Sequence, residues 1–188
     1  MNNDDLHIIS DILAGKVRRY DAIVDRYSRQ VFSLIVRVVQ NAEEAEELTQ
    51  DTFLKAFQHL NRFHASSSFA TWLYRIAYNT ALSASRRKPL SEVNFEAESL
   101  ANLSDSKVDE ILDDPNPTEQ LLNRLESAID MLSPDERVIV TLFYLQGTSI
   151  AEISRIVGIK ESTLKVQLMR IRKKLYLLIT QMQDDDEQ

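Results

Sequence analysis

Hydrophobic residues recur every three or four positions over most of the chain, the spacing of helices that pack on one side. This spacing predicts helices over residues 4–14, 16–39, 42–60, 69–87, 118–132 and 134–146. The periodicity is lost over residues 88–116, which are rich in Ser, Asn, Asp and Glu, so we expect a linker there with short helical turns around residues 108–112. The pattern therefore predicts an all-α fold of two small helical domains.

The stretch from Thr148 to Leu175 predicts two further helices separated by a sharp turn. Ser149 and Glu152 have the spacing of a capping box, and Gly158 suits the left-handed end of the first helix. The second helix carries one narrow apolar stripe, formed by Leu164, Leu168, Ile171, Leu175 and Leu178. The C-terminal domain is therefore predicted to be a helix-turn-helix.

The face opposite this stripe combines cations with small residues. Its members are Ser162, Val166, Met169, Arg170 and Lys173, with Lys165 and Arg172 on the flank. Arg and Lys bind guanine edges or phosphates in the DNA major groove, and small apolar groups contact thymine methyls. A solvated basic face is the alternative, but the capped partner helix and glycine turn before it favour duplex DNA.

The charge distribution accounts for a net charge of −7 in a chain that is predicted to bind DNA. Residues 89–136 hold two basic and thirteen acidic side chains, whereas residues 137–183 hold eight basic and two acidic ones. We therefore divide the chain into an N-terminal domain (1–88), an acidic linker (89–117), a C-terminal domain (118–183) and an acidic tail (184–188).

Aromatic and cationic residues alternate in the helix predicted over residues 69–87, which follows a polar loop at residues 61–68. This helix carries Trp72, Tyr74, Arg75, Tyr78, Asn79, Arg86 and Arg87. Such a surface suits single-stranded nucleic acid, because bases stack on rings while cations hold the backbone. The spacing alone favours the alternative that Trp72 and the tyrosines belong to the core.

The sequence shows no catalytic or metal-binding pattern. It has no Cys, its three His residues fall on different predicted elements, and it lacks a glycine-rich phosphate loop. We expect no enzymatic activity, cofactor or metal. The acidic N-terminus has no signal-peptide core and no apolar run is long enough to cross a bilayer, so we expect a cytoplasmic protein without direct membrane insertion.

Two blocks of the chain resemble the extracytoplasmic-function (ECF) group of sigma factors of bacterial RNA polymerase, in the sigma-70 family. The first covers residues 45–57 and continues through residues 60–63 to residues 69–79. The second covers residues 132–137 and the helix-turn-helix. The resemblance implies a protein that binds core RNA polymerase and directs promoter recognition, melting and transcription initiation. The alternatives are a stand-alone helix-turn-helix regulator and a purely protein-binding helical adaptor.

The resemblance also implies partners and contact residues. The partners are the clamp helices of the polymerase's largest subunit and its flap, promoter DNA in double-stranded and melted form, and an anti-sigma factor. The candidate polymerase-binding residues are Glu47, Gln50, Asp51, Phe53 and Leu54. The candidates for the melted −10 element are Phe63, His64, Ser66, Ser67, Ser68, Trp72, Asn79, Arg86 and Arg87. The candidates for the −35 duplex are Ser162, Thr163, Lys165, Val166, Met169, Arg170 and Lys173.

The acidic linker resembles the family segment that threads toward the polymerase cleft, where its negative charge could imitate RNA; a solvated spacer is the alternative. Three positions depart from the family. His64-Ala65-Ser66 stands where Arg-Gly-Asp is frequent, Lys160 replaces a common Ser cap, and Val166-Gln167 replaces Ser-Arg. We therefore expect unusual −10 and −35 preferences.

Overall fold

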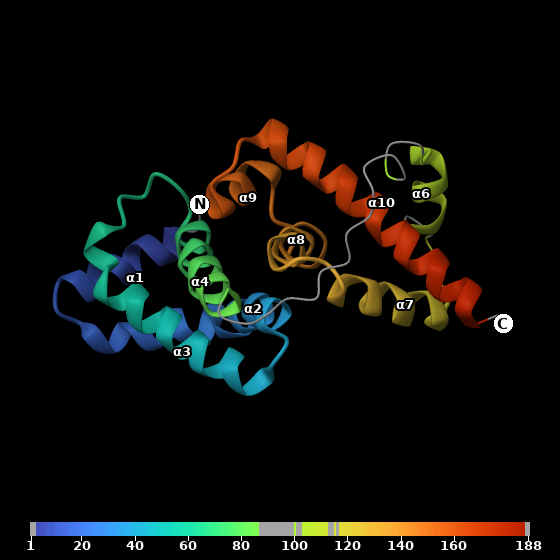
Figure 1. Cartoon of the computed structure of the whole chain (residues 1–188). Helices are drawn as coiled ribbons and strands as arrows, with labels where there is room; N and C mark the ends of the chain where they lie inside the picture. Colours follow the sequence, from blue (N-terminus) through green and yellow to red (C-terminus); the bar gives the residue numbers. More distant parts are fainter. Residues whose placement is uncertain (1–2, 87–99, 101–102, 113–114, 116, 187–188) are drawn as a thin grey trace.

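The computed structural model describes residues 3–86, 100, 103–112, 115 and 117–186, and these contain helices and no strand. The all-α prediction is confirmed. The α-helices are α1 (Asn3–Leu13), α2 (Asp21–Val39), α3 (Ala42–Gln58), α4 (Phe69–Ser85), α6 (Asp105–Leu112), α7 (Glu119–Asp130), α8 (Pro134–Val140), α9 (Ile150–Val157) and α10 (Glu161–Asp186) (Figure 1). Short 3₁₀ turns η1 (Val17–Tyr20) and η2 (Leu60–Arg62) precede α2 and follow α3.

Most predicted helix ends lie within two residues of the observed ones, and three differ by more. The helix expected over residues 16–39 begins as the 3₁₀ turn η1 and becomes α-helical only at Asp21. The helix expected over residues 134–146 changes at Thr141 into η3 (Thr141–Leu145), a π-helical turn in which the Gln146 amide bonds to the Thr141 carbonyl at 3.0 Å. In addition, α10 continues into the acidic tail as far as Asp186.

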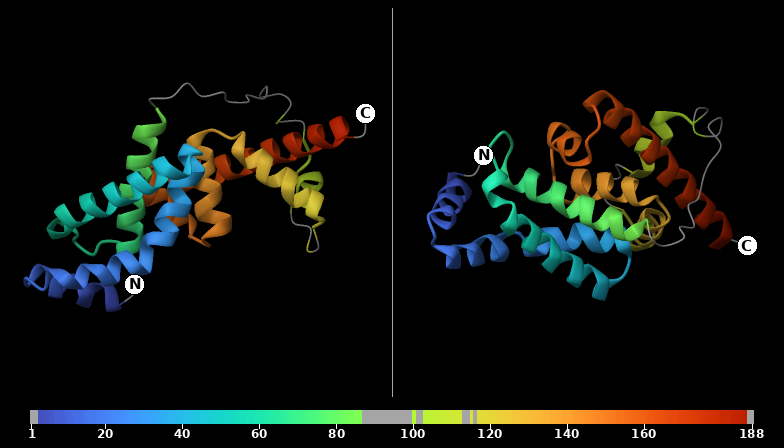
Figure 2. Two further views of the ribbon diagram at one scale, coloured as in Figure 1. Left: turned by 90° about the horizontal axis from the view of Figure 1, so that it is seen from below. Right: turned by 60° about the vertical axis from the view of Figure 1, so that its left-hand side comes forward.

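The N-terminal body consists of α2, α3 and α4, which pack on one another, with α1 and η1 at one end (Figure 2). Ile23, Leu34 and Leu73 are fully buried among them. Asn41 caps α3 and Ser68 caps α4, each accepting a hydrogen bond from the amide three residues later. These caps fix where α3 and α4 begin, and the Ser68 cap ends the loop that joins the two helices.

The C-terminal body consists of α7, α8, α9 and α10. Capping boxes begin α8 at Ser133 and α9 at Ser149, as the sequence predicts for Ser149. Gly158 ends α9 with φ +79°, a left-handed conformation that favours glycine. The predicted apolar stripe of α10 is buried, since Leu164, Leu168, Ile171, Leu175 and Leu178 are all at most 7% exposed.

The two bodies pack against each other, with α4 on α9 and α2 on α8. The buried Arg137 of α8 donates to the carbonyls of Val38, at 3.1 Å, and Asp130, at 2.8 Å. These carbonyls lie in the last turns of α2 and α7, where a cation also complements the helix dipole. One guanidinium thus joins the ends of two helices from different bodies.

No helix in the described part of the chain has the length and apolar character needed to span a membrane.

Candidate nucleic-acid and protein interfaces

The first half of α10 presents the predicted DNA-reading face to solvent. Ser162, Thr163, Lys165, Val166, Met169 and Arg170 are all exposed. Val166 and Met169 are large apolar side chains exposed by 45% and 44%, so this face offers apolar contact as well as charge. Leu164 and Leu168 hold this helix on the core, so the cations and the exposed apolar groups have a rigid support.

Lys173 does not belong to this open surface in the structure. It is only 8% exposed, and its Nζ donates to the Leu103 carbonyl at 2.8 Å and lies 3.1 Å from Asp105 Oδ1. The neighbouring Arg172 donates to Asp109 Oδ1 at 2.7 Å and to Tyr144 Oη at 2.9 Å. The sequence could not reveal this, because helical periodicity places Lys173 on the open face and does not report what another segment covers.

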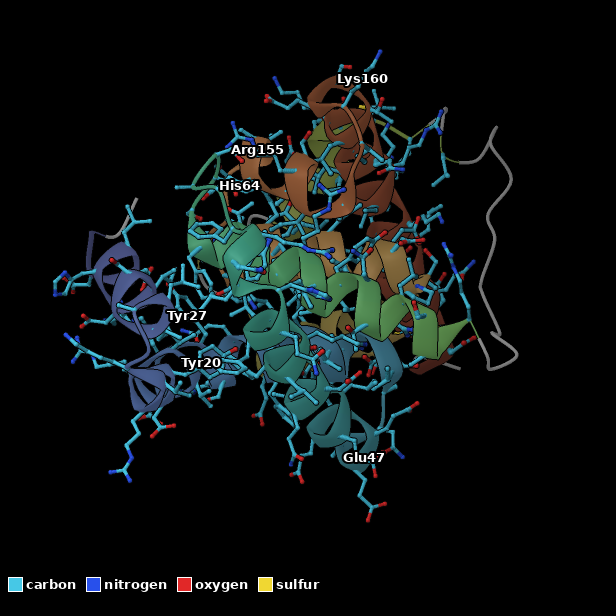
Figure 3. All side chains as sticks on the ribbon, turned by 90° about the vertical axis from the view of Figure 1, so that its left-hand side faces the viewer. Tyr20, Tyr27, Glu47, His64, Arg155 and Lys160 are labelled. Carbon is cyan, nitrogen blue, oxygen red and sulfur yellow. The ribbon has the colours of Figure 1, made fainter. Side chains whose placement is uncertain are left out.

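The loop before α4 joins exposed polar residues to an aromatic cluster. His64 and Ser66 are exposed, and His64 projects on the side of the molecule where α9 carries Arg155 (Figure 3). Ala65 has φ +53°, a backbone conformation that suits the glycine frequent at this place in the resembling family. Ser68 is occupied as the cap of α4, and Ser67 donates to the Ser68 carbonyl at 3.3 Å.

Phe63 and Trp72 flank the buried Phe69 in one aromatic cluster. Their ring centroids lie 5.5 Å from that of Phe69 and 5.6 Å from each other. Phe63 and Trp72 remain half-buried, so each ring both packs on the core and keeps an accessible part. Trp72 is therefore intermediate between the two predicted alternatives, a core residue and a stacking surface for single-stranded nucleic acid.

The exposed side of α4 is a polar and cationic strip. Asn79 and Arg86 lie on it, together with Arg75, a cation one turn before Asn79 that is not among the predicted −10 residues. Arg87 falls outside the described residues. Arg75, Asn79 and Arg86 are spaced by four and seven residues, so they lie on one side of α4.

The two tyrosines of α4 contribute to packing and to hydrogen bonding within the fold. Tyr74 is buried, and burial raises its pKa to about 12. Tyr78 donates to Asp135 Oδ1 at 2.6 Å, across to the N-terminal end of α8. Burial first, and the Asp135 hydrogen bond second, raise the pKa of Tyr78. Both phenols therefore stay protonated at neutral pH, and Tyr78 acts as a donor between the two bodies.

On α3, the candidate polymerase-binding residues separate into an exposed set and a buried one. Glu47, Gln50 and Leu54 are exposed, and Glu47 projects away from the helices (Figure 3). Asp51 pairs with Lys55 at 2.6 Å. Phe53 is only 6% exposed, so it belongs to the core; its carbonyl accepts a hydrogen bond from Tyr20. The exposed side of α3 therefore carries one apolar side chain, Leu54, together with the polar Gln50 and Glu47.

Comparison with known proteins identifies the family. Residues 23–89 match Sigma-70 region 2, and residues 122–175 match Sigma-70, region 4. The RNA polymerase sigma-H factor of Pseudomonas aeruginosa is 32% identical over 179 residues, which cover 90% of each chain. The chain is a sigma factor of the ECF group. The ECF sigma-E factor of Escherichia coli K12 is 32% identical over 173 residues, covering 88% of this chain and 89% of that protein.

Solved structures agree on the fold. The sigma factor RpoE of Bartonella quintana, in complex with the anti-sigma factor NepR, has a TM-score of 0.62 at 21% identity, covering 86% of this chain and 96% of that one. CnrH, in complex with the cytosolic domain of CnrY, has a TM-score of 0.63 at 18% identity, covering 95% and 96%.

As a sigma factor, the protein binds core RNA polymerase and directs promoter recognition, melting and transcription initiation. The two regions occur in the predicted order along the chain. The stand-alone regulator and the protein-binding adaptor, predicted as alternatives, are therefore excluded.

Proposed function

We propose that this sigma factor binds the −35 duplex through the first half of α10. The observation that carries the proposal is the open face of Lys165, Val166, Met169 and Arg170, held rigidly by the buried stripe behind it. Arg170 and Lys165 supply base-edge or phosphate contacts, while Val166 and Met169 supply apolar contact with thymine methyls. Ser162 and Thr163, at the start of the helix, are placed to contact phosphate.

Arg170→Ala and Lys165→Ala are each expected to weaken binding to the −35 duplex by about 1–3 kcal/mol, because each removes a cation from the groove. The measurement is fluorescence anisotropy with a labelled −35 duplex, taken from a promoter selected out of a random library by transcription with core polymerase. Arg29→Ala, which removes one exposed cation from α2, is the control and should leave the affinity unchanged. If Arg29→Ala and Arg170→Ala weakened the affinity for the duplex equally, the loss would reflect the overall charge of the protein and not a contact made by α10.

The melted −10 element is the proposed ligand of the α4 surface. Exposed Asn79 can hydrogen-bond the edge of an extruded base, and His64 and Ser66 in the loop can line the space that receives it. The accessible parts of the Phe63 and Trp72 rings provide stacking surface, and Arg75 and Arg86 provide charge for the backbone. The proposed role of Ser67 and Ser68 is to hold the conformation of the loop, not to contact DNA.

For the clamp helices of the polymerase's largest subunit, the proposed surface is the exposed side of α3. Glu47, Gln50 and Leu54 lie at positions i, i+3 and i+7, which places them on one face. Asp51 lies at its edge. The exposed fraction of Leu54, 54%, makes it the apolar anchor of this contact, whereas Phe53 positions α3 from the core.

Leu54→Ala is therefore expected to weaken association with core polymerase by roughly 1–2 kcal/mol, the loss typical of an anchoring side chain in an interface. The affinity is measured by competition for core enzyme against the unaltered, labelled sigma factor. Leu13→Ala removes a comparably exposed leucine (56%) from α1 and serves as the control. If the two variants behave alike, the contact does not depend on this face of α3.

Regulation by an anti-sigma factor and a cytoplasmic location complete the proposal. The solved structures of RpoE and CnrH hold their sigma factors in complexes, with NepR and with the cytosolic domain of CnrY, and this supports a similar partner here. The location follows from the partner, since core polymerase acts on chromosomal DNA. The acidic linker is proposed to enter the polymerase cleft when the holoenzyme forms.

A further inference from the structure

The short helix α6 of the acidic linker lies beside the middle of α10 (Figure 1). Two of its three carboxylates, Asp105 and Asp109, are one helical turn apart, and they face Lys173 and Arg172 at 3.1 and 2.7 Å. Val108, between them, is 2% exposed and anchors α6. The contact is therefore both electrostatic and apolar.

This contact adjoins the proposed −35 surface. The cleft between α6, η3 and α10 is lined by Asp105, Tyr144, Lys165, Met169, Arg172 and Lys173. Lys165 and Met169 thus belong both to the proposed DNA-reading face and to the wall beside α6. Lys173 lies eight residues after Lys165, about 12 Å further along the same helix at 1.5 Å per residue.

An α-helix in the major groove has a phosphate strand on each side, because the groove is only about 12 Å wide. With α10 in the groove, Lys173 on the groove-facing side and Arg172 on its flank would lie near such a strand. In the structure, two carboxylates on one face of α6 pair with these cations. The α6 carboxylates thus make the ion pairs that DNA phosphates would make.

We propose that α6 is an intramolecular competitor of duplex DNA for α10, and that it leaves α10 when the −35 element binds. This inference rests on the proposed −35 site. The free sigma factor therefore shields part of its basic face from non-specific DNA. Because Asp105 and Asp109 are themselves largely exposed, 68% and 57%, the ion pairs are readily exchanged for phosphate contacts.

A matched pair of charge changes on the full chain tests the proposal. Asp109→Asn is expected to tighten binding to the −35 duplex about threefold, because it removes one carboxylate that competes for Arg172. Glu110→Gln removes an equal charge from the next residue, which is exposed on α6, and is expected to leave the affinity unchanged. Equal tightening in both variants would mean general repulsion and would overturn the proposal.

The variant Asp105→Asn/Val108→Ser/Asp109→Asn removes the two carboxylates and the apolar anchor together, and is expected to tighten duplex binding about tenfold. Hydrogen exchange provides a second readout: adding the duplex to the unaltered protein should speed exchange of the α6 amides. Unchanged affinity in the triple variant, or α6 protection unaffected by saturating duplex, would refute the competition. If instead Arg170→Ala did not weaken duplex binding, the −35 site itself would be refuted. Failure of the competition and failure of the −35 site are therefore distinguishable.

Discussion

Leu164→Ala is expected to lower the free energy of unfolding of the C-terminal body by about 3 kcal/mol. Leu164 is fully buried where α10 begins, and it belongs to the same core as the fully buried Ile153 of α9. Truncation leaves a cavity at the junction of the helix-turn-helix, where two short connected elements have little freedom to close it. The measurement is urea denaturation followed by circular dichroism.

Val166→Ala is the matched comparison, two residues further along the same helix. Val166 is 45% exposed, so its truncation is expected to change stability by less than about 0.5 kcal/mol. It should nevertheless weaken −35 binding, because it removes apolar contact from the groove-facing side. The opposite result, with Val166→Ala destabilising and Leu164→Ala neutral, would reverse the assignment of the two faces of α10.

Arg137→Met is expected to cost about 3 kcal/mol of stability, since it removes charge-assisted hydrogen bonds from two backbone carbonyls, one of them buried, while keeping much of the side-chain volume. One of those carbonyls, of Val38, belongs to the other body, so the variant should also separate the two bodies. We expect a larger radius of gyration in small-angle scattering, and unfolding in two steps instead of one.

Arg37→Gln is the comparison for Arg137. Arg37 also joins α2 to α7, through Glu126 at 2.9 Å, but Glu126 is 65% exposed and the pair is solvated. Its loss is expected to cost at most about 1 kcal/mol. If both arginine variants open the molecule equally, surface charge and not the buried guanidinium holds the bodies together.

Much of the fold could be predicted, because each helix has one apolar stripe and clear end signals. Gly158 and the Ser149–Glu152 pair mark their turn through local backbone chemistry that needs no tertiary information. The π-helical turn at residues 141–145 could not be predicted in this way. Its bonds reach five residues back, and the apolar pattern there reads as ordinary helix.

The site residues were harder to predict from the sequence than the helices were. The exposed candidates on α10 follow from periodicity, because the opposite stripe is unambiguous. Lys173 shows the limit of this reasoning. It lies under α6, a segment more than sixty residues earlier in the chain, and no local pattern encodes that contact. Phe53 differs, because Phe53, Ala56 and Leu60 recur at helical spacing and are all buried, so periodicity alone places Phe53 on the core side. Arg137, like Lys173, carried no signal of its role.

The contact between α4 and α9 sets a requirement on the length of the chain between them. The −10 and −35 elements are about 25 base pairs apart by their positions, on the order of 85 Å of B-DNA. On the proposed assignment of the two elements to the two bodies, bodies that touch cannot reach both elements at once, so they must separate when the promoter is bound. Fully extended, the 29 residues from 89 to 117 reach about 100 Å, which is enough for that span. Shortening this segment by half should leave each body able to bind its own element, yet prevent the protein from joining the two on one promoter.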